Sequence, residues 1–423
     1  MSGPPVRRRS GPHLDDPWAG PLGRWWGRRP GLIRGGGAAL QLSPDGIFRP
    51  LVAAGARMRR GDGEVVLRFY VDGALQQADV RSWLPGASDT SIAGYVTRMN
   101  RQLDGRRFCL VLNHLQTFDA SLWLRLRNFL RGLQERVGVA PGSIDVAVFV
   151  GTYRCTPFGV HRDAADSLSV VVAGRKRFLF WPGSRFEAGG WIDNSARYGR
   201  VRASATTVVA SPGDLVHWPS SVWHVAESTP PYSVSLSVPV LLPHGGRADI
   251  YGAVIQQLRD ALHAGARGER TFADRDAGRA LRAFVTAVRQ TLRRGVRAKS
   301  LAEEARGAWL RATTGHGFMA VPRLAPYRAL GPGWWLRGDA DYPIVWLRSG
   351  PRTLRYGANG LSFEAPLAAG LIALLRRLNR GDVVSADATR GAGRSLLEKL
   401  LQARAITRVE GRTAPRATAT RRR

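Results

Sequence analysis

The residues of this 423-residue chain that could do chemistry gather in its middle third. His161 and Asp163 are separated by one residue, so on an extended strand their side chains point to the same face. The segment 213–224, GDLVHWPSSVWH, supplies His224 after a turn, a strand and a Pro-containing bend. Two histidines and one carboxylate form the ligand set of mononuclear Fe(II) sites with open coordination positions, unlike a closed tetrahedral zinc site. We therefore predict a metal centre formed by these three residues.

Lys176 is distinctive because the chain has only three lysines among its 63 basic residues. It lies thirteen residues after Asp163, in the sequence GRKRFLFW. Alternation along a strand places Arg175 and Arg177 on the face opposite Lys176. A compact ammonium that faces the interior can pair with the far carboxylate of a metal-bound 2-oxo acid. The alternative interpretations are a surface cation in a hairpin turn and, for His161 and Asp163, a surface histidine beside a solvated aspartate.

The elements that must position these residues are short strands. Six segments are rich in β-branched or aromatic residues and are bounded by turn residues: 145–153, 167–173, 176–181, 206–210, 214–218 and 232–240. Many short strands with turns between them predict a double-sheet roll or barrel, and the lack of strand–helix alternation argues against a parallel Rossmann sheet. Ahead of them, 119–138 predicts an amphipathic helix capped by Asp119. Its predicted apolar face consists of Leu122, Leu126, Phe129, Leu130, Leu133 and Val137.

The remainder of the chain has a different character. Residues 251–312 are rich in Ala, Leu and Arg and predict helices, and the Gly/Pro-rich segment 313–335 predicts a linker. Strands are then expected at 343–348, 353–356, 361–364 and 405–409, and helices at 366–379 and 394–404. This order of short strands and helices is typical of a small winged-helix-like domain.

Composition limits the function without deciding it. The net charge is +31, which favours contact with nucleic acid, but so strong a bias to arginine is also what a GC-rich genome produces. Two cysteines, Cys109 and Cys155, cannot form a disulfide framework or a zinc ribbon. No apolar stretch is long enough for a membrane span and no secretory leader is recognisable. We therefore expect a cytoplasmic protein without membrane contact.

Four motifs resemble those of the JmjC/cupin-fold Fe(II)- and 2-oxoglutarate-dependent oxygenases, and specifically their ribosomal-oxygenase branch. GRWWGRRPGLIR at 23–34 resembles the entry motif of that branch, and PFGVHRD at 157–163 its approach to the His-x-Asp pair. GRKRFLFWP at 174–182 resembles the strand that binds 2-oxoglutarate, and 213–224 the segment that carries the second histidine. The resemblance of residues beyond 250 is architectural.

The resemblance implies an α+β fold with a double-stranded β-helix core of the jelly-roll, cupin or JmjC type, followed by a helical region and a winged-helix-like domain. It implies His161, Asp163 and His224 as the Fe(II) ligands and Lys176 as the partner of 2-oxoglutarate, with Tyr153, Thr156 and Ser233 as weaker candidates beside that co-substrate. The domains expected are a basic tail at 1–19, the oxygenase domain at 20–245, a helical region at 246–312, the winged-helix-like domain at 313–410 and a second basic tail at 411–423.

The function implied is hydroxylation of a protein side chain, with O2 as the second co-substrate and with release of succinate and CO2. A protein or peptide substrate, such as a ribosomal protein, is expected; hydroxylation is favoured over demethylation because the branch hydroxylates. The helical region 246–312 could pair with its copy in a homodimer, and the basic tails could contact nucleic acid weakly. Two alternatives stay open: a peptide or natural-product tailoring hydroxylase on the same scaffold, and a non-catalytic basic winged-helix protein that binds nucleic acid.

Overall fold

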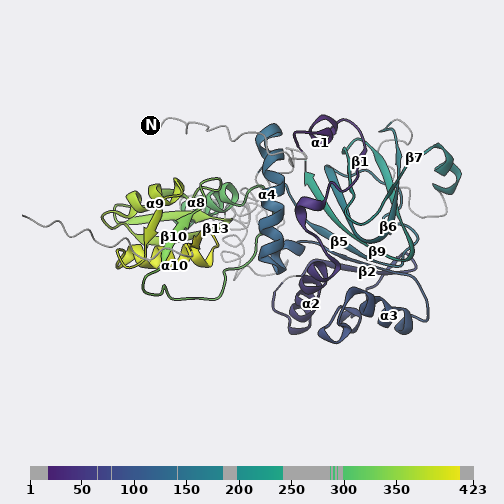
Figure 1. Ribbon diagram of the computed structural model, residues 1–423, viewed down its shortest axis with the longest axis horizontal. Helices are drawn as coiled ribbons and strands as arrows, with labels where there is room; N and C mark the ends of the chain where they lie inside the picture. Colours follow the sequence, from purple (N-terminus) through teal and green to yellow (C-terminus); the bar gives the residue numbers. More distant parts are fainter. Residues whose placement is uncertain are drawn as a thin grey trace, which may run out of the picture. The chain divides into compact units, whose positions relative to one another are not determined.

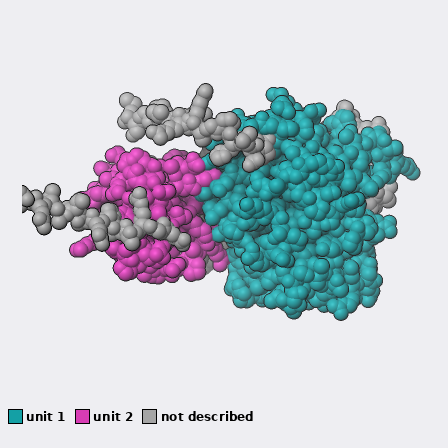
Figure 2. Space-filling model, viewed as in Figure 1, with its two compact units in different colours: residues 1–245 teal, residues 246–423 magenta. Residues whose placement is uncertain are grey.

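The computed structural model divides the chain into two compact units, Met1–Gly245 and Gly246–Arg423, drawn in teal and magenta in Figure 2. It describes residues 18–183 except 64, 78 and 141, residues 198–241, the single residues 286, 289, 290 and 293, and residues 299–409. The two basic tails lie almost wholly outside the described residues. So does most of the helical region predicted at 246–312, together with the dimer contact expected of it.

The described strands of the first unit form one antiparallel sheet of nine strands. These strands are β1 (Gly31–Ile33), β2 (Leu67–Val71), β3 (Ala74–Leu75), β4 (Phe108–Leu112), β5 (Ala147–Gly151), β6 (Ala165–Trp181), β7 (Thr206–Ala210), β8 (Leu215–Trp218) and β9 (Trp223–Leu241). They pair in the order β1-β8-β6-β9-β5-β4-β2-β3, and β7 pairs with β6. The six segments predicted as strands all lie in this sheet, although 167–173 and 176–181 are two halves of β6.

The long strands β6 and β9 curve through the unit and give it two faces (Figure 1). On one face β5 pairs with the second half of β9, which pairs with the first half of β6, and that half pairs with β8. On the other face His161 bridges to the first half of β9, which pairs with the second half of β6, and that half pairs with β7. This order of pairing is a jelly roll, so the predicted roll is present.

Gly174 allows β6 to change from one face to the other. The pairing register of β6 shifts on either side of Ala173, and Gly174 has a φ of 68°, in the left-handed region that favours glycine. A Cβ atom at Gly174 would lie 2.0 Å from the carbonyl oxygen of Tyr232 on β9. The bend therefore requires glycine both for its backbone angle and for the close approach of the neighbouring strand.

We expect Gly174→Ala to lower the free energy of unfolding by about 2 to 5 kcal/mol, because left-handed strain adds to the overlap with β9. Gly61→Ala is the matched control: Gly61 has a φ of 71°, but nothing lies within 4 Å of the added Cβ. It should cost only the strain, about 1 to 2 kcal/mol. Urea unfolding of the full chain measures both losses, and equal losses would refute the steric argument.

Helices pack outside the strands of the first unit. They are α1 (Pro21–Trp25), α2 (Pro44–Arg60), α3 (Ile92–Gln102) and α4 (Ala120–Val137). Short 3-10 turns occur at Ala38–Leu40, Arg81–Trp83, Ala87–Asp89, Leu115–Phe118 and Gly199–Ser204. The predicted helix 119–138 is α4, whose first turn is capped by the Asp119 carboxylate accepting from the backbone N–H groups of Ser121 and Leu122. The predicted apolar face is buried except at Val137, which is 54% exposed because it ends the helix.

The second unit, described by itself, contains three helices and six strands over residues 299–409. These are α8 (Lys299–Thr314), β10 (Trp335–Gly338), β11 (Val345–Arg348), β12 (Thr353–Ala358), β13 (Leu361–Pro366), α9 (Leu371–Asn379), β14 (Val383–Ser385), α10 (Ala392–Gln402) and β15 (Ile406–Arg408). Two three-stranded sheets, β14-β10-β15 and β11-β12-β13, share a core with α9 and α10. The predicted strands and helices are present, but α9 begins after Gly370 rather than at 366, since β13 continues to Pro366. A winged-helix assignment stays a prediction.

None of the helices in the described part of the chain combines the length and the apolar character that crossing a membrane requires.

Candidate metal and co-substrate site

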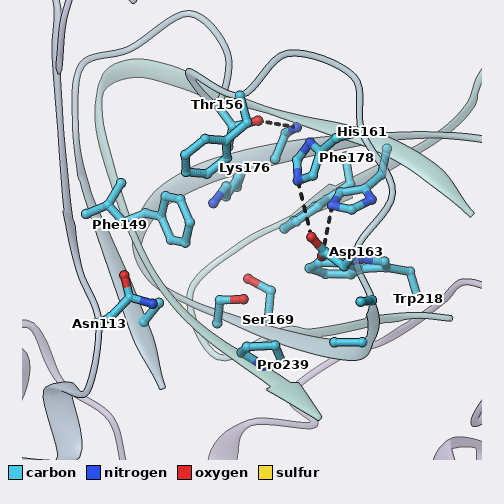
Figure 3. A pocket seen from close by; sticks show the side chains of 18 of the residues that line it. Asn113, Phe149, Thr156, His161, Asp163, Ser169, Lys176, Phe178, Trp218 and Pro239 are labelled. Atoms are coloured by element: carbon cyan, nitrogen blue, oxygen red, sulfur yellow. Dashed lines mark hydrogen bonds and ion pairs between the residues drawn. The ribbon is translucent and has the colours of Figure 1, made fainter. Parts of the chain in front are cut away.

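His161, Asp163 and His224 come together in one cluster, and Figure 3 shows His161 and Asp163 facing one another. The backbone N–H of each histidine donates to the carbonyl oxygen of the other, at 3.0 and 2.8 Å, and this pairing holds the two imidazoles side by side. Asp163 precedes β6 and reaches toward both rings. Its carboxylate oxygens lie 3.5 Å from His161 Nε2 and 3.5 Å from His224 Nε2. One ligand atom from each of the three residues lies within 4.8 Å of the others.

The hydrogen bonds of the two histidines favour metal binding through Nε2. His161 Nδ1 lies 3.0 Å from the carbonyl oxygen of Gly159, and His224 Nδ1 lies 3.3 Å from that of Val222. A carbonyl only accepts, so Nδ1 must carry the proton and Nε2 keeps its lone pair, turned toward the carboxylate. Ligating histidines are generally oriented in this way. The 3.5 Å separations exceed those of charge-assisted hydrogen bonds, so the donor set fits a divalent cation.

The protonation states of the ligands agree with this fit. Burial raises the pKa of the Asp163 carboxyl, but the interactions with the side chains of His161 and His224 outweigh it and bring the pKa to about 2. Burial lowers the pKa of His224 to about 4, and the neighbouring His161 acts in the same direction. The chain therefore presents an ionised carboxylate and a neutral His224 imidazole at neutral pH, the forms that bind a metal.

Lys176 is a buried cation in the interior of the roll. Its side chain extends from the second half of β6, the residue is 3% exposed, and its Nζ donates to Ser235 Oγ on β9 at 2.7 Å. The Nζ also lies 4.6 Å from the ring centroid of Phe149 and 5.5 Å from that of Phe178. No carboxylate among the described residues pairs with it. A buried ammonium without a counterion is costly, so its position indicates a binding site for an anion.

Burial lowers the pKa of Lys176 to about 8, because the ammonium is removed from water. We therefore expect the affinity for a carboxylate ligand to fall as the pH rises through about 8, where the free protein loses this charge. The measurement is kcat/KM for 2-oxoglutarate between about pH 7 and about pH 9.5, which reports the ionisation of the free enzyme. Lys176→Arg should abolish this decline because a guanidinium stays charged over the range. A decline that persists in the arginine variant would rule Lys176 out as its source.

The three metal-ligand candidates and Lys176 line the same cavity, of about 290 Å³ (Figure 3). Much of the remaining wall is apolar and includes Val111, Phe149, Phe158, Phe178 and Leu241. Arg68, on β2, is exposed and also lines it. Asp163 is the one carboxylate among the described lining residues. The cavity thus combines a cluster of candidate metal ligands, a buried cation and largely apolar walls.

The three weaker candidates from the sequence take different positions. Thr156 lines the cavity, and its Oγ1 accepts from the backbone N–H of Ala226. Tyr153 and Ser233 do not line it: the Ser233 hydroxyl donates to the Tyr153 hydroxyl at 3.4 Å, and the Tyr153 ring lies 5.8 Å from the Lys176 Nζ. Burial raises the pKa of Tyr153 above its ordinary value. Tyr153 therefore lies near Lys176 without lining the cavity, and Ser233 contacts Tyr153.

Sequence reasoning missed Ser235, which accepts a hydrogen bond from Lys176, and several polar residues that line the cavity: Asn113, Arg68, Ser169 and Ser237. The alternating serines in YSVSLSV, at 233, 235 and 237, mark one face of a strand and could have indicated Ser235 and Ser237. Asn113 lies 48 positions before His161 and has no local motif. His217, which lies close to His224 in sequence, is not a ligand candidate: it is fully buried and stacks on Trp26 with ring centroids 4.7 Å apart.

Comparisons with known proteins find matches among solved structures only. No family model matches the chain, and no curated protein matches its sequence. Among solved structures, the X-ray structure of Escherichia coli YcfD is 16% identical and has a TM-score of 0.44, with 92% of this chain and 97% of that chain covered.

Two further structures are described as YcfD, a ribosomal oxygenase from Escherichia coli, in complex with cobalt. The complex with succinic acid is 16% identical with a TM-score of 0.42, and the complex with 2-oxoglutarate is 15% identical with a TM-score of 0.41; each covers the same shares of the two chains. A cupin superfamily protein from Desulfitobacterium hafniense is 11% identical over 24% of this chain and 69% of that chain, with a TM-score of 0.17.

Proposed function

We propose that this chain is an Fe(II)- and 2-oxoglutarate-dependent dioxygenase that hydroxylates a protein side chain. The observation that carries the proposal is the pairing of two features in one cavity: the cluster of His161, Asp163 and His224, and the buried Lys176 without a carboxylate partner among the described residues. The first fits Fe(II) with open positions. The second fits the far carboxylate of 2-oxoglutarate. This molecule has a carboxylate at each end, so the metal would bind one of them and Lys176 the other.

The residues of the chain have separate tasks in this reaction. Fe(II), when bound, supplies the redox chemistry that couples decarboxylation of 2-oxoglutarate with O2 to oxidation of a C–H bond, giving succinate and CO2. His161, Asp163 and His224 would hold it. Lys176, oriented by its hydrogen bond to Ser235, would bind the far carboxylate and fix the direction of the co-substrate. The apolar walls would exclude water from the reacting groups.

The proposed substrate class rests on the resemblance of the sequence motifs. We propose a protein substrate, with ribosomal proteins as the first class to test, because the resembling branch is named for them. The oxygenase domain is assigned to 20–245, and the winged-helix-like region 313–410 with its basic neighbours would contribute contacts to a macromolecular target. The tailoring-hydroxylase alternative shares the same site and differs only in what enters it.

The deciding experiment measures succinate release by the purified full chain given Fe(II), ascorbate and 2-oxoglutarate. Intact-mass proteomics then compares the parent strain with one that lacks the gene and seeks proteins that have lost the mass of one oxygen atom. Succinate release with a protein hydroxylated only in the parent supports the proposal. Release without any such protein favours the tailoring hydroxylase. No release together with salt-sensitive binding to DNA or RNA favours the non-catalytic alternative.

A further inference from the structure

The first unit has a second cavity, of about 390 Å³, apart from the one that holds the candidate metal ligands. Three loops contribute to its wall: the β2–β3 turn at 72–73, the segment 105–107 that leads into β4, and the segment 153–157 that follows β5. None of the described residues lines both cavities. Pockets of this volume are typical of sites for small ligands.

Hydrogen bonds tie the three loops to one another. The backbone N–H of Asp72 donates to the carbonyl oxygen of Arg107 at 2.8 Å, and the backbone N–H of Arg107 donates to Asp72 Oδ1 at 3.0 Å. The backbone N–H of Thr152 donates to the carbonyl oxygen of Phe108 at 3.0 Å, and the N–H of Phe108 donates to Thr152 Oγ1 at 3.2 Å. The cavity therefore has its shape before a ligand enters, as small-molecule sites generally do.

Three arginines, Arg106, Arg107 and Arg154, line this cavity. Arg106 Nε donates to the carbonyl oxygen of Leu103, and Arg107 Nη1 donates to that of Thr152, each at 3.3 Å. These acceptors are neutral, so they orient the two guanidinium groups without compensating their charge. None of the three arginines forms an ion pair with a carboxylate in the part of the chain that the structure describes. A guanidinium has five N–H donors, so most of these donors remain for a ligand.

The charge of the cavity selects the class of ligand. Asp72 is the one acid among its described lining residues, so three positive charges face one negative charge. A phosphate monoester carries about −1.5 to −2 charges at neutral pH, which matches this excess. Its three terminal oxygens lie on one phosphorus atom, and guanidinium groups bind such oxygens in pairs. Arg106 and Arg107 come from one loop and Arg154 from another, so they can contact one phosphate from two sides.

The floor of the cavity is closed and uncharged. Phe108, Cys109 and Tyr153 line it and are 1%, 1% and 4% exposed. Burial raises the pKa of the Cys109 thiol above its ordinary value, so this group adds no negative charge at neutral pH. Walls of low dielectric concentrate the field of charges around a cleft. An anion is therefore attracted more strongly here than by three arginines on an open surface.

From these observations we infer that this cavity binds a small phosphate monoester through Arg106, Arg107 and Arg154. The ligand is a small molecule rather than a nucleic-acid strand, because the charges line a bounded cavity and not a groove that a backbone could follow. The site is independent of the proposed dioxygenase reaction, with which it shares no residue.

The test is isothermal titration calorimetry of the purified full chain with phenyl phosphate as the probe, in a phosphate-free buffer at about pH 7.5. We expect saturable binding that persists in Lys176→Met, since Lys176 lies in the other cavity. Arg106→Ala and Arg154→Ala should each raise the Kd about tenfold, the loss of a charge-assisted hydrogen bond. Both side chains belong to exposed residues, so neither substitution removes buried packing.

The matched control is Arg101→Ala, which removes an exposed arginine of α3 outside the cavity. It lowers the net charge by the same amount and should bind phenyl phosphate as wild type does. Succinate, which carries its two charges on separate carboxylates, should bind the wild-type chain at least tenfold more weakly than phenyl phosphate.

Four results would overturn the inference. Absence of phenyl phosphate binding overturns it, and so does a Kd unchanged in both variants of the cavity arginines. An equal rise of the Kd in Arg101→Ala shows attraction by overall charge only, and loss of binding in Lys176→Met places the phosphate in the other cavity. Tighter binding of succinate, or of an RNA oligonucleotide whose affinity falls in the cavity variants, assigns the arginines to another class of ligand. Succinate release is not measured, so the proposed function stands or fails separately.

Discussion

Replacing His161 with alanine is expected to abolish turnover of 2-oxoglutarate by removing one of the three proposed metal ligands. The two remaining ligands cannot hold Fe(II) in the cavity at ordinary concentrations. Even the loss of an outer partner of a ligand commonly costs 10- to 100-fold in metal affinity, so losing the ligand itself should cost at least about a hundredfold. Equilibrium dialysis against Fe(II), or against Co(II) in air, measures the affinity, and succinate release measures turnover.

The control for this variant is His316→Ala, which removes a histidine of the second unit that packs edge-on against Tyr342. It should bind metal and release succinate as wild type does. Thermal unfolding distinguishes a local loss from a folding defect, because His161→Ala also removes a buried ring that contacts Phe158 and His224. A folded His161→Ala chain with full metal affinity would refute the assignment of this residue as a ligand.

The metal-ligand candidates could be found from the sequence because two of them share one strand-like segment. His161 and Asp163 are two positions apart, and that spacing alone predicts a shared face. His224 needed the resemblance of its segment, since nothing local says which strand returns beside residue 161. In the structure the reason is a single pair of backbone hydrogen bonds between His161 and His224. Sequence periodicity predicts which residues share a face of a strand, but it does not predict which distant strands pair.

The rest of the site depends on such long-range pairing. Asn113 enters the cavity because β4 pairs with β5, and Asp145 holds its amide from a segment 32 positions later. The helices α2 and α3 were not predicted either. In α2, Pro50 and two glycines lower the helical propensity. Packing against neighbouring elements, which buries Ile47, Phe48 and Leu51, outweighs that propensity.

The overall charge proved less informative than the buried Lys176. A net charge of +31 is compatible with several functions, and the described cavity has few charges. Lys176 could be singled out because lysine is rare in this chain, and the structure places it where neither solvent nor a described carboxylate compensates its charge. A buried ammonium without a counterion lowers the stability of the fold, so its presence indicates a role in ligand binding. A variant that removes the charge can therefore separate a functional from a structural lysine, by its effects on binding and on stability.

Lys176→Met is expected to weaken 2-oxoglutarate binding while leaving the fold as stable or making it more stable. A charge-assisted hydrogen bond contributes about 1.5 to 3 kcal/mol, so KM for 2-oxoglutarate should rise about tenfold to a hundredfold. Because burial lowers the pKa of Lys176 to about 8, the folded chain disfavours the ammonium, and an apolar side chain of similar length relieves this cost. The melting temperature should therefore hold or increase.

The matched control for Lys176→Met is Lys399→Met, which removes an exposed ammonium from α10 in the second unit. Neither KM nor the melting temperature should change in that variant, since an exposed charge contributes little. Initial rates of succinate release over a range of 2-oxoglutarate concentrations give KM, and differential scanning calorimetry gives the melting temperature. A lower melting temperature with an unchanged KM would make Lys176 a structural residue. The opposite pair of results follows only if this buried cation is retained for an anionic co-substrate.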